Sequence, residues 1–286
     1  MQKENKMAVM PIPKLVLTMS FPIMISMLVQ SLYNIVDGIF VSRINENALT
    51  ATSIAYSAQM LQIAVAVGTG VGVNAVVSRY LGAKEWDKVN KSATTGLFLS
   101  IISSFLFVIW GIFGTRPFIE LFTEDPEILE MGTEYLQICQ IFATGIFLGT
   151  ITQRLLQATG RTVSSMFAQI AGAVVNIIFD PLLIFGIGFF PEMGIAGAAA
   201  ATVLGQWTAA LIGMILNKVQ NKEILFVFQS FHFDRDIIIA IYKVGFPTIL
   251  MQAIGSIMMA LMNLILVMFS TTAVAFFGVY YKLQNF

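Results

Sequence analysis

The sequence predicts an all-α polytopic membrane protein, and three observations support this. Apolar residues make up 57% of the 286 residues, charged residues make up only 11%, and the mean hydropathy is +0.82. Soluble domains carry roughly twice that charged fraction. Apolar stretches of about 20 residues, the length that a helix needs to cross a bilayer, recur along the chain. A bilayer accommodates this much apolar surface, whereas a soluble core of this size does not.

The apolar stretches can be assigned to spans one by one. The first is too long for the apolar core of a signal peptide, and no small-x-small cleavage site follows it, so it is expected to be a span. Such boundaries carry an error of about 2–4 residues. Seven spans are expected at 15–41, 51–77, 93–114, 132–157, 163–187, 194–216 and 244–269, and an eighth begins near 272.

Basic residues between the spans predict the orientation. Cytoplasmic loops carry an excess of Lys and Arg. If the spans alternate in direction, one side holds only Arg43 and Arg116 together with a series of acids. The other side, with the N-terminus, is therefore expected to be the cytoplasmic side of a plasma (inner) membrane. Its basic residues are Lys3, Lys6, Lys14, Arg79, Lys84, Lys88, Lys91, Arg154, Arg161, Lys218, Lys222, Arg235 and Lys243.

An internal repeat predicts a second lobe. A shift of 225 residues pairs Phe21-Pro22 with Phe246-Pro247 and aligns the first span with the seventh. Many transporters consist of two repeated bundles around a central site. We expect a six-helix N-lobe plus the first one and a half helices of a repeated second lobe, with twelve helices in the full-length form; the alternative is a complete seven-span protein. The expected domains are the N-lobe at 1–217, a cytoplasmic connector at 218–243 and the start of the C-lobe at 244–286.

Two acids lie deep within the expected spans, Asp37 in the first and Asp180 in the fifth. Ionisable groups at such positions are costly and usually functional. Both spans run in the same direction, and the depths of the two acids agree within a helical turn. The carboxylates are therefore expected to meet in the outer half of one cavity. The alternatives are an interfacial acid that reaches outward for Asp37 and a helix-ending Asp-Pro turn for Asp180.

Polar residues accompany each acid on its own helical face. In the fifth span, Gln169 and Asn176 precede Asp180, and Pro181 frees the carbonyl of Ile177. A freed carbonyl, an amide oxygen and a carboxylate suit a hard cation such as Na⁺. Two buried carboxylates close together can instead hold a proton near neutral pH, so the sequence leaves H⁺ and Na⁺ open. In the first span, the polar residues at three- and four-residue steps are Ser26, Gln30, Tyr33, Asn34 and Asp37.

Several classes of function are disfavoured. The formal net charge is 0 and there is no basic block, so nucleic acid is not expected as a partner. One Cys, Cys139, and one His, His232, predict neither a disulfide framework nor a structural metal site. The sequence contains no phosphate-binding loop, so it does not indicate ATP-driven transport. An aspartyl protease would pair two aspartates, but the sequence has no Gly-x-Gly-Asp motif, so neither an enzyme nor a cofactor is expected.

The order and spacing of several short motifs resemble the multidrug and toxic compound extrusion (MATE) family. These motifs are Pro22, the stretch 34–43, the residues 82–84, the stretch 122–127 followed by Tyr135-Leu136, and the stretches 157–160, 176–184 and 197–202. The resemblance covers all 286 residues. It implies a twelve-helix fold of two six-helix lobes around a central cleft.

The resemblance also implies a cation site in the N-lobe. In branches of the family with such a site, it is formed by the acids of spans one and five, the asparagine one turn before the second acid, nearby tyrosines and a span-six threonine. Another branch places a glutamate in span seven, and the corresponding stretch 252–257 has none. The matching positions here are Asp37, Asp180, Asn176, Tyr33, Tyr135 and Thr202. The residues expected to line the substrate cavity are Gln30, Asn34, Gln169 and Gln206.

The implied activity is secondary active multidrug efflux. A gradient of H⁺ or Na⁺ would drive amphipathic, often cationic organic compounds outward by alternating access. The expected partners are small-molecule drugs or toxins and the lipid bilayer, and no oligomer is required. The alternative is a lipid or lipid-linked oligosaccharide flippase of related architecture. Such a flippase would be expected to carry a more basic central cavity, whereas these spans hold almost no Lys or Arg beyond their ends.

Overall fold

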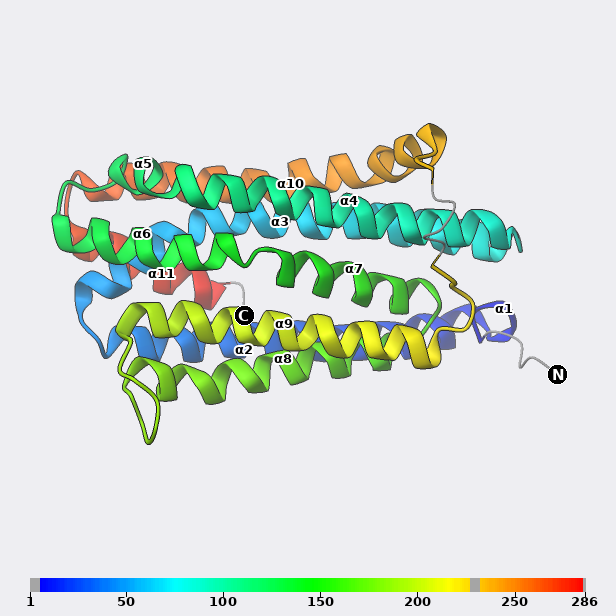
Figure 1. Cartoon of the computed structure of the whole chain (residues 1–286), viewed down its shortest axis with the longest axis horizontal. Helices are drawn as coiled ribbons and strands as arrows, with labels where there is room; N and C mark the ends of the chain where they lie inside the picture. Colours follow the sequence, from blue (N-terminus) through cyan, green and yellow to red (C-terminus); the bar gives the residue numbers. More distant parts are fainter. Residues whose placement is uncertain (1–5, 227–231, 285–286) are drawn as a thin grey trace.

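The computed structural model describes residues 6–226 and 232–284, and in these ranges it is a bundle of long helices (Figure 1). Lys3 and the middle of the expected connector, 227–231, lie outside the described residues. The helices are α1 (Lys6–Val9), α2 (Ile12–Ser42), α3 (Glu46–Gly82), α4 (Trp86–Phe113), α5 (Thr115–Glu120), α6 (Pro126–Ile141), α7 (Thr144–Ala158), α8 (Thr162–Ile184), α9 (Gly194–Gln220), α10 (Arg235–Val267) and α11 (Thr271–Gln284).

The long helices confirm the expected all-α membrane fold. Six of the described helices, α2, α3, α4, α8, α9 and α10, are long and apolar enough to cross a membrane. The bent pair α6 and α7 makes a seventh if it forms one span. The shorter apolar stretch Thr271–Tyr281 in α11 corresponds to the expected eighth.

The expected fourth span, 132–157, is not one straight helix. α6 and α7 are bent by 47° where they meet, around Phe142 and Ala143. The expected span therefore corresponds to the two helices together. Its bend has no proline to mark it, and the apolar composition continues through it. The bend matters for the site, since α7 carries part of the cavity wall.

Apolar clusters close the bundle near its two ends. One cluster joins the end of α2 to the start of α3 and to α6, and it includes Val41, Ile54 and Leu136. The other joins the end of α3 to α7 and the start of α10, and it includes Val77 and Leu155. Burial of such side chains is worth roughly 1.5–3 kcal/mol each. Tyr135 belongs to the first cluster and also lines the cavity, so this cluster borders the cavity.

Close helix contacts depend on small residues. α3 packs along α10, and α8 packs along α9. A Cβ on Gly245 of α10 would lie 2.7 Å from the carbonyl oxygen of Gly68, and a Cβ on Gly205 would lie 2.7 Å from that of Gly172. Small residues allow such close backbone approach in membrane bundles. In contrast, α2 packs mainly on α8 and contacts α3 much less.

The connector between α9 and α10 is shorter than expected. α9 ends at Gln220, and α10 begins at Arg235, which is 9 residues before the expected start of the C-lobe at 244. The side chain of Asp234 caps α10 by accepting a hydrogen bond from a backbone N–H of the first turn. The expected connector 218–243 is therefore too long, because hydropathy detects the apolar part of α10 and not its polar first turns.

Candidate cation and substrate site

A cavity of about 530 Å³ lies among α2, α3, α7, α8 and α9. This volume is typical of small-molecule sites, which span roughly 300–1,000 Å³. Two of the 30 described lining residues are charged, Asp37 and Arg154. Most of the remaining polarity comes from amides, which can both donate and accept hydrogen bonds. The eight lining glutamines are Gln30, Gln59, Gln62, Gln153, Gln157, Gln169, Gln206 and Gln252.

Helical periodicity brings these side chains to the cavity. Residues three and four apart on a helix share one face. The α2 face consists of Ile23, Ser26, Met27, Gln30, Tyr33, Asn34 and Asp37. The α7 face consists of Ile146, Gly149, Thr150, Gln153, Arg154 and Gln157. The α8 face consists of Ser165, Gln169, Gly172, Ala173 and Asn176.

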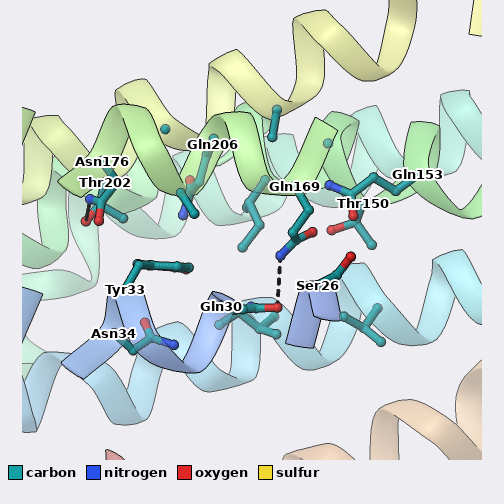
Figure 2. A pocket seen from close by; sticks show the side chains of 18 of the residues that line it. Ser26, Gln30, Tyr33, Asn34, Thr150, Gln153, Gln169, Asn176, Thr202 and Gln206 are labelled. Carbon is teal, nitrogen blue, oxygen red and sulfur yellow. Dashed lines mark hydrogen bonds between the residues drawn. The ribbon is translucent and has the colours of Figure 1, made fainter. Parts of the chain in front are cut away.

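The acidic end of the cavity is formed by Tyr33, Asp37, Tyr135, Asn176 and Thr202. Figure 2 shows Asn176 and Thr202 side by side, and the Asn176 amide nitrogen lies 3.4 Å from the Thr202 hydroxyl. The same nitrogen lies 3.4 Å from Oδ1 of Asp180. The phenols of Tyr33 and Tyr135 lie near both Asp37 and Asp180. The structure thus places all six residues of the expected cation site in one neighbourhood.

The two acids differ in their access to the cavity. Asp37 lines the cavity and is 6% exposed, whereas Asp180 is fully buried and does not line it. Asn176 lines the cavity and bonds to Asp180, so it connects the deeper carboxylate to the cavity.

The amide oxygen of Asn176 provides an argument for a bound cation. Among the described residues, this Oδ1 atom is buried and has no hydrogen-bond partner. An unpartnered buried polar atom costs about 1–3 kcal/mol. Sodium would satisfy it as a ligand, and a protonated carboxyl would satisfy it as a donor. Two carboxylates, an amide oxygen and a hydroxyl form a donor set that suits either species.

A side-chain hydrogen bond crosses the middle of the cavity. Nε2 of Gln169 on α8 donates to Oε1 of Gln30 on α2 at 2.9 Å (Figure 2). Asn34 and Gln206 also line the cavity, so the four residues expected to line it are all in its wall. The Gln206 Oε1 atom is buried without a partner within the described structure, and this leaves an acceptor for a ligand.

The basic end of the cavity is formed by Thr150, Gln153, Arg154, Gln157 and Ser165. Arg154 Nη1 donates to Gln157 Oε1 at 3.0 Å, and Gln157 Nε2 donates to Ser165 Oγ at 3.0 Å. The assignment of Arg154 to a cytoplasmic connector is wrong, because the residue lies within α7 and lines the cavity. Thr150, Gln153 and Gln157 are spaced at three- and four-residue intervals, like the polar residues of α2. This spacing predicts a polar face on α7 and therefore the basic end of the cavity.

The family profile of MatE matches residues 22–182, which is more than half of the chain and includes both aspartates. The chain belongs to the MatE family. This MatE chain is similar to the multidrug export protein MepA of Staphylococcus saprophyticus, with 26% identity over 270 residues that cover 93% of this chain and 58% of the relative. It is also similar to MepA of Staphylococcus aureus strain MRSA252, with 25% identity over 279 residues that cover 96% of this chain and 60% of the relative. The chain therefore spans less than two thirds of the length of these curated relatives.

Solved structures show the same fold. One is described as the inward-facing conformation of a multidrug resistance MATE family transporter of the MOP superfamily. It matches this MatE chain with a TM-score of 0.83 and 29% identity, covering 94% of this chain and 61% of that chain. The outward-facing conformation of such a transporter matches with a TM-score of 0.79 and 27% identity, covering 95% and 63%.

Proposed function

We propose that this MatE chain serves secondary active multidrug efflux. In this proposal an H⁺ or Na⁺ gradient drives amphipathic, often cationic organic compounds across the plasma membrane, and the N-terminus is cytoplasmic. The names of the similar relatives and structures, which refer to multidrug export and multidrug resistance, support it. Movement of such compounds needs no covalent step and no cofactor besides the coupling ion.

One structural observation carries the proposal. Asp37 and Asn176 line one end of a cavity large enough for a small organic molecule, and Asn176 connects this end to the buried Asp180 behind it. A cationic drug near this end and a coupling cation would compete for the same negative charge. Antiport requires such competition, since each ligand must change the affinity for the other.

The packing of α2 suggests how binding could change the conformation. α2 carries Asp37 and packs mainly on α8, which carries Asp180. Neutralisation of the acids by a cation would change the electrostatics of this helix contact. Pro22 interrupts the hydrogen bonding of α2 and provides a place for it to flex. We propose that this shift disfavours drug binding and promotes release to the outside, after which the lobes rock to reopen inward.

Dye efflux from cells without their own pumps tests the proposal. We would express the gene that encodes this chain, and its Asp180→Asn and exposed-surface Glu124→Gln variants, at matched membrane levels. Wild type and Glu124→Gln are expected to export a fluorescent cationic dye, whereas Asp180→Asn is expected to lose at least about tenfold in rate, because a charge in a coupled buried site is removed. Equal export by all three would exclude Asp180 from coupling. No export of any of several dyes by wild type would contradict drug efflux and direct attention to the flippase alternative.

A further inference from the structure

Arg154 is the one basic side chain among the described residues of the cavity wall. Ionisable side chains within membrane-spanning helices usually face a polar cavity and serve a function, and Arg154 lines this cavity from the last turns of α7. The proposed cation coupling at the acidic end gives Arg154 no role. Its presence at the opposite end of the same cavity therefore needs a separate explanation.

The protein uses little of the hydrogen-bonding capacity of Arg154. A guanidinium carries five N–H donors, and one hydrogen bond, to Gln157, joins this group to the described residues. No carboxylate of the described chain lies within ion-pair distance of it, since the ion pairs there involve other cations. The stem is held in place: a Cβ on Gly70 would lie 2.9 Å from Cγ of Arg154. The aliphatic part of Arg154 is thus fixed by packing, and most of its guanidinium N–H groups have no partner among the described residues. Such a side chain is positioned to bind a ligand.

Arg154 and Asp37 are too far apart to neutralise each other. On α3, Tyr56 lies near Asp37, and Gly70 lies against the stem of Arg154. These two α3 residues are 14 positions apart, which corresponds to roughly 21 Å along a helix at 1.5 Å per residue. The cavity therefore has a negative end and a positive end that act on different parts of a ligand or on different ligands.

We propose that the basic end is a subsite for an oxyanion group, such as a carboxylate, of amphiphilic substrates. The planar guanidinium fork matches the geometry of a carboxylate or phosphate. Gln153 and Thr150 lie on the same face of α7 and offer neutral hydrogen bonds beside it. The proposal rests on the proposed efflux function and assigns the part of the cavity that would hold an acidic group of a substrate.

Two dyes that differ in one group test the subsite. Rhodamine 110 carries a free carboxylate, and rhodamine 123 is its methyl ester, so the pair differs only in the oxyanion. Binding to the purified full chain in detergent would be followed by fluorescence anisotropy for wild type, Arg154→Gln and Arg154→Lys. Arg79→Gln is the matched control, because Arg79 is exposed near the end of α3, does not line the cavity, and loses the same charge.

Arg154→Gln is expected to weaken rhodamine 110 binding about tenfold and to leave rhodamine 123 binding within about twofold of wild type, since a charge-assisted hydrogen bond is lost for one dye alone. Arg154→Lys, which keeps the charge without the fork, is expected to fall between wild type and Arg154→Gln, and it remains informative if Arg154→Gln does not fold. Arg79→Gln is expected to match wild type for both dyes.

The outcomes separate this proposal from the function on which it rests. If wild type binds both dyes, and Arg154→Gln weakens the binding of both equally or of neither, the proposed oxyanion subsite is contradicted, whereas the proposal of drug binding is not. If wild type binds neither dye, drug binding and the subsite both fail. The source of the oxyanion is decided by competition: displacement of rhodamine 110 by soluble dihexanoyl phosphatidylglycerol supports a lipid phosphate, and displacement by octanoate alone supports a substrate carboxylate.

Discussion

At the scale of single residues, Asn176 links the buried Asp180 to the cavity. Its amide nitrogen is shared between Asp180 and Thr202, and its oxygen has no partner among the described residues. An amide held in this way has its orientation fixed by the hydroxyl on one side and the carboxylate on the other. The affinity for a coupling cation should therefore depend on Thr202, although Thr202 carries no charge.

Thr202→Val tests this dependence, because it removes the hydroxyl and keeps the shape of the side chain. The apparent affinity for the coupling cation is expected to fall roughly three- to tenfold, the worth of a neutral hydrogen bond. The affinity for Na⁺ would be measured from the rise in Tm with NaCl, with choline chloride as the reference. The affinity for H⁺ would be measured from the change in Tm as the pH is lowered. Thr208→Val on the same helix is the control, since Thr208 bonds only to a backbone carbonyl and does not line the cavity. An unchanged cation response in Thr202→Val would remove Thr202 from the site.

Part of the acidic end was predictable from regular spacing, whereas Tyr135 and Thr202 were expected there only from the resemblance to the MATE family. Asp37 ends a polar series at three- and four-residue steps, and Asn176 precedes Asp180 by one turn. Arg154 was not found because it lies close to the end of an apolar stretch, where basic residues usually belong to a loop. The expected span 132–157 nevertheless contains Arg154, and the three- and four-residue steps from Thr150 to Gln153 and Gln157 predict a polar face beside it.

At the scale of elements, α10 is held against α3 by contacts that leave no room for side chains. Gly245→Ala would place a methyl group 2.7 Å from the carbonyl oxygen of Gly68. Because a backbone carbonyl cannot move away cheaply, the free energy of unfolding is expected to fall by about 1–3 kcal/mol. Thermal unfolding in detergent measures this. Gly82→Ala is the control: a Cβ there meets nothing within 4 Å, so a neutral or slightly stabilising effect, up to about 1 kcal/mol, is expected. Equal Tm values for the two variants would contradict the close approach of α3 and α10.

The connector after α9 is attached to the bundle by an ion pair between Arg161 and Glu223. These side chains are 26% and 22% exposed, whereas those of the Arg116–Glu120 pair are 70% and 49% exposed. Glu223→Gln is therefore expected to lower stability by about 1–3 kcal/mol, because it leaves a partly buried cation poorly compensated. Glu120→Gln is expected to have no measurable effect. Parallel denaturation curves decide this, and similar losses in both variants would show that burial does not distinguish the two pairs.

The long helices could be predicted from apolar length alone, but their internal geometry could not. The span at 15–41 corresponds to α2 and that at 163–187 to α8 because both stretches are continuous and bounded by polar residues. The bend between α6 and α7 is not marked by a proline, so apolar length alone does not predict it.

At the scale of the whole molecule, burial differs sharply among the spans. In the apolar window of α3, 56% of the residues are buried, whereas in that of α2 only 6% are buried. α3 is thus the central helix of the described bundle, and α2 exposes large apolar side chains such as Leu17 and Met24. Lipid accommodates such surface without an energetic cost, and a soluble protein would not leave it open. The weak attachment of α2 fits the moving role that we propose for it.

The distribution of basic residues predicts that the start of α4 around Lys91 is cytoplasmic and that the loop around Glu124 is outside. Lys91→Cys and Glu124→Cys test this, because both positions are exposed and the native Cys139 is buried. In intact cells, a membrane-impermeant maleimide is expected to label Glu124→Cys and not Lys91→Cys, and after permeabilisation it is expected to label both. Wild type, with Cys139 alone, gives the background. The reverse pattern would invert the orientation and place the acidic end of the cavity on the cytoplasmic side, which would contradict cation entry from outside.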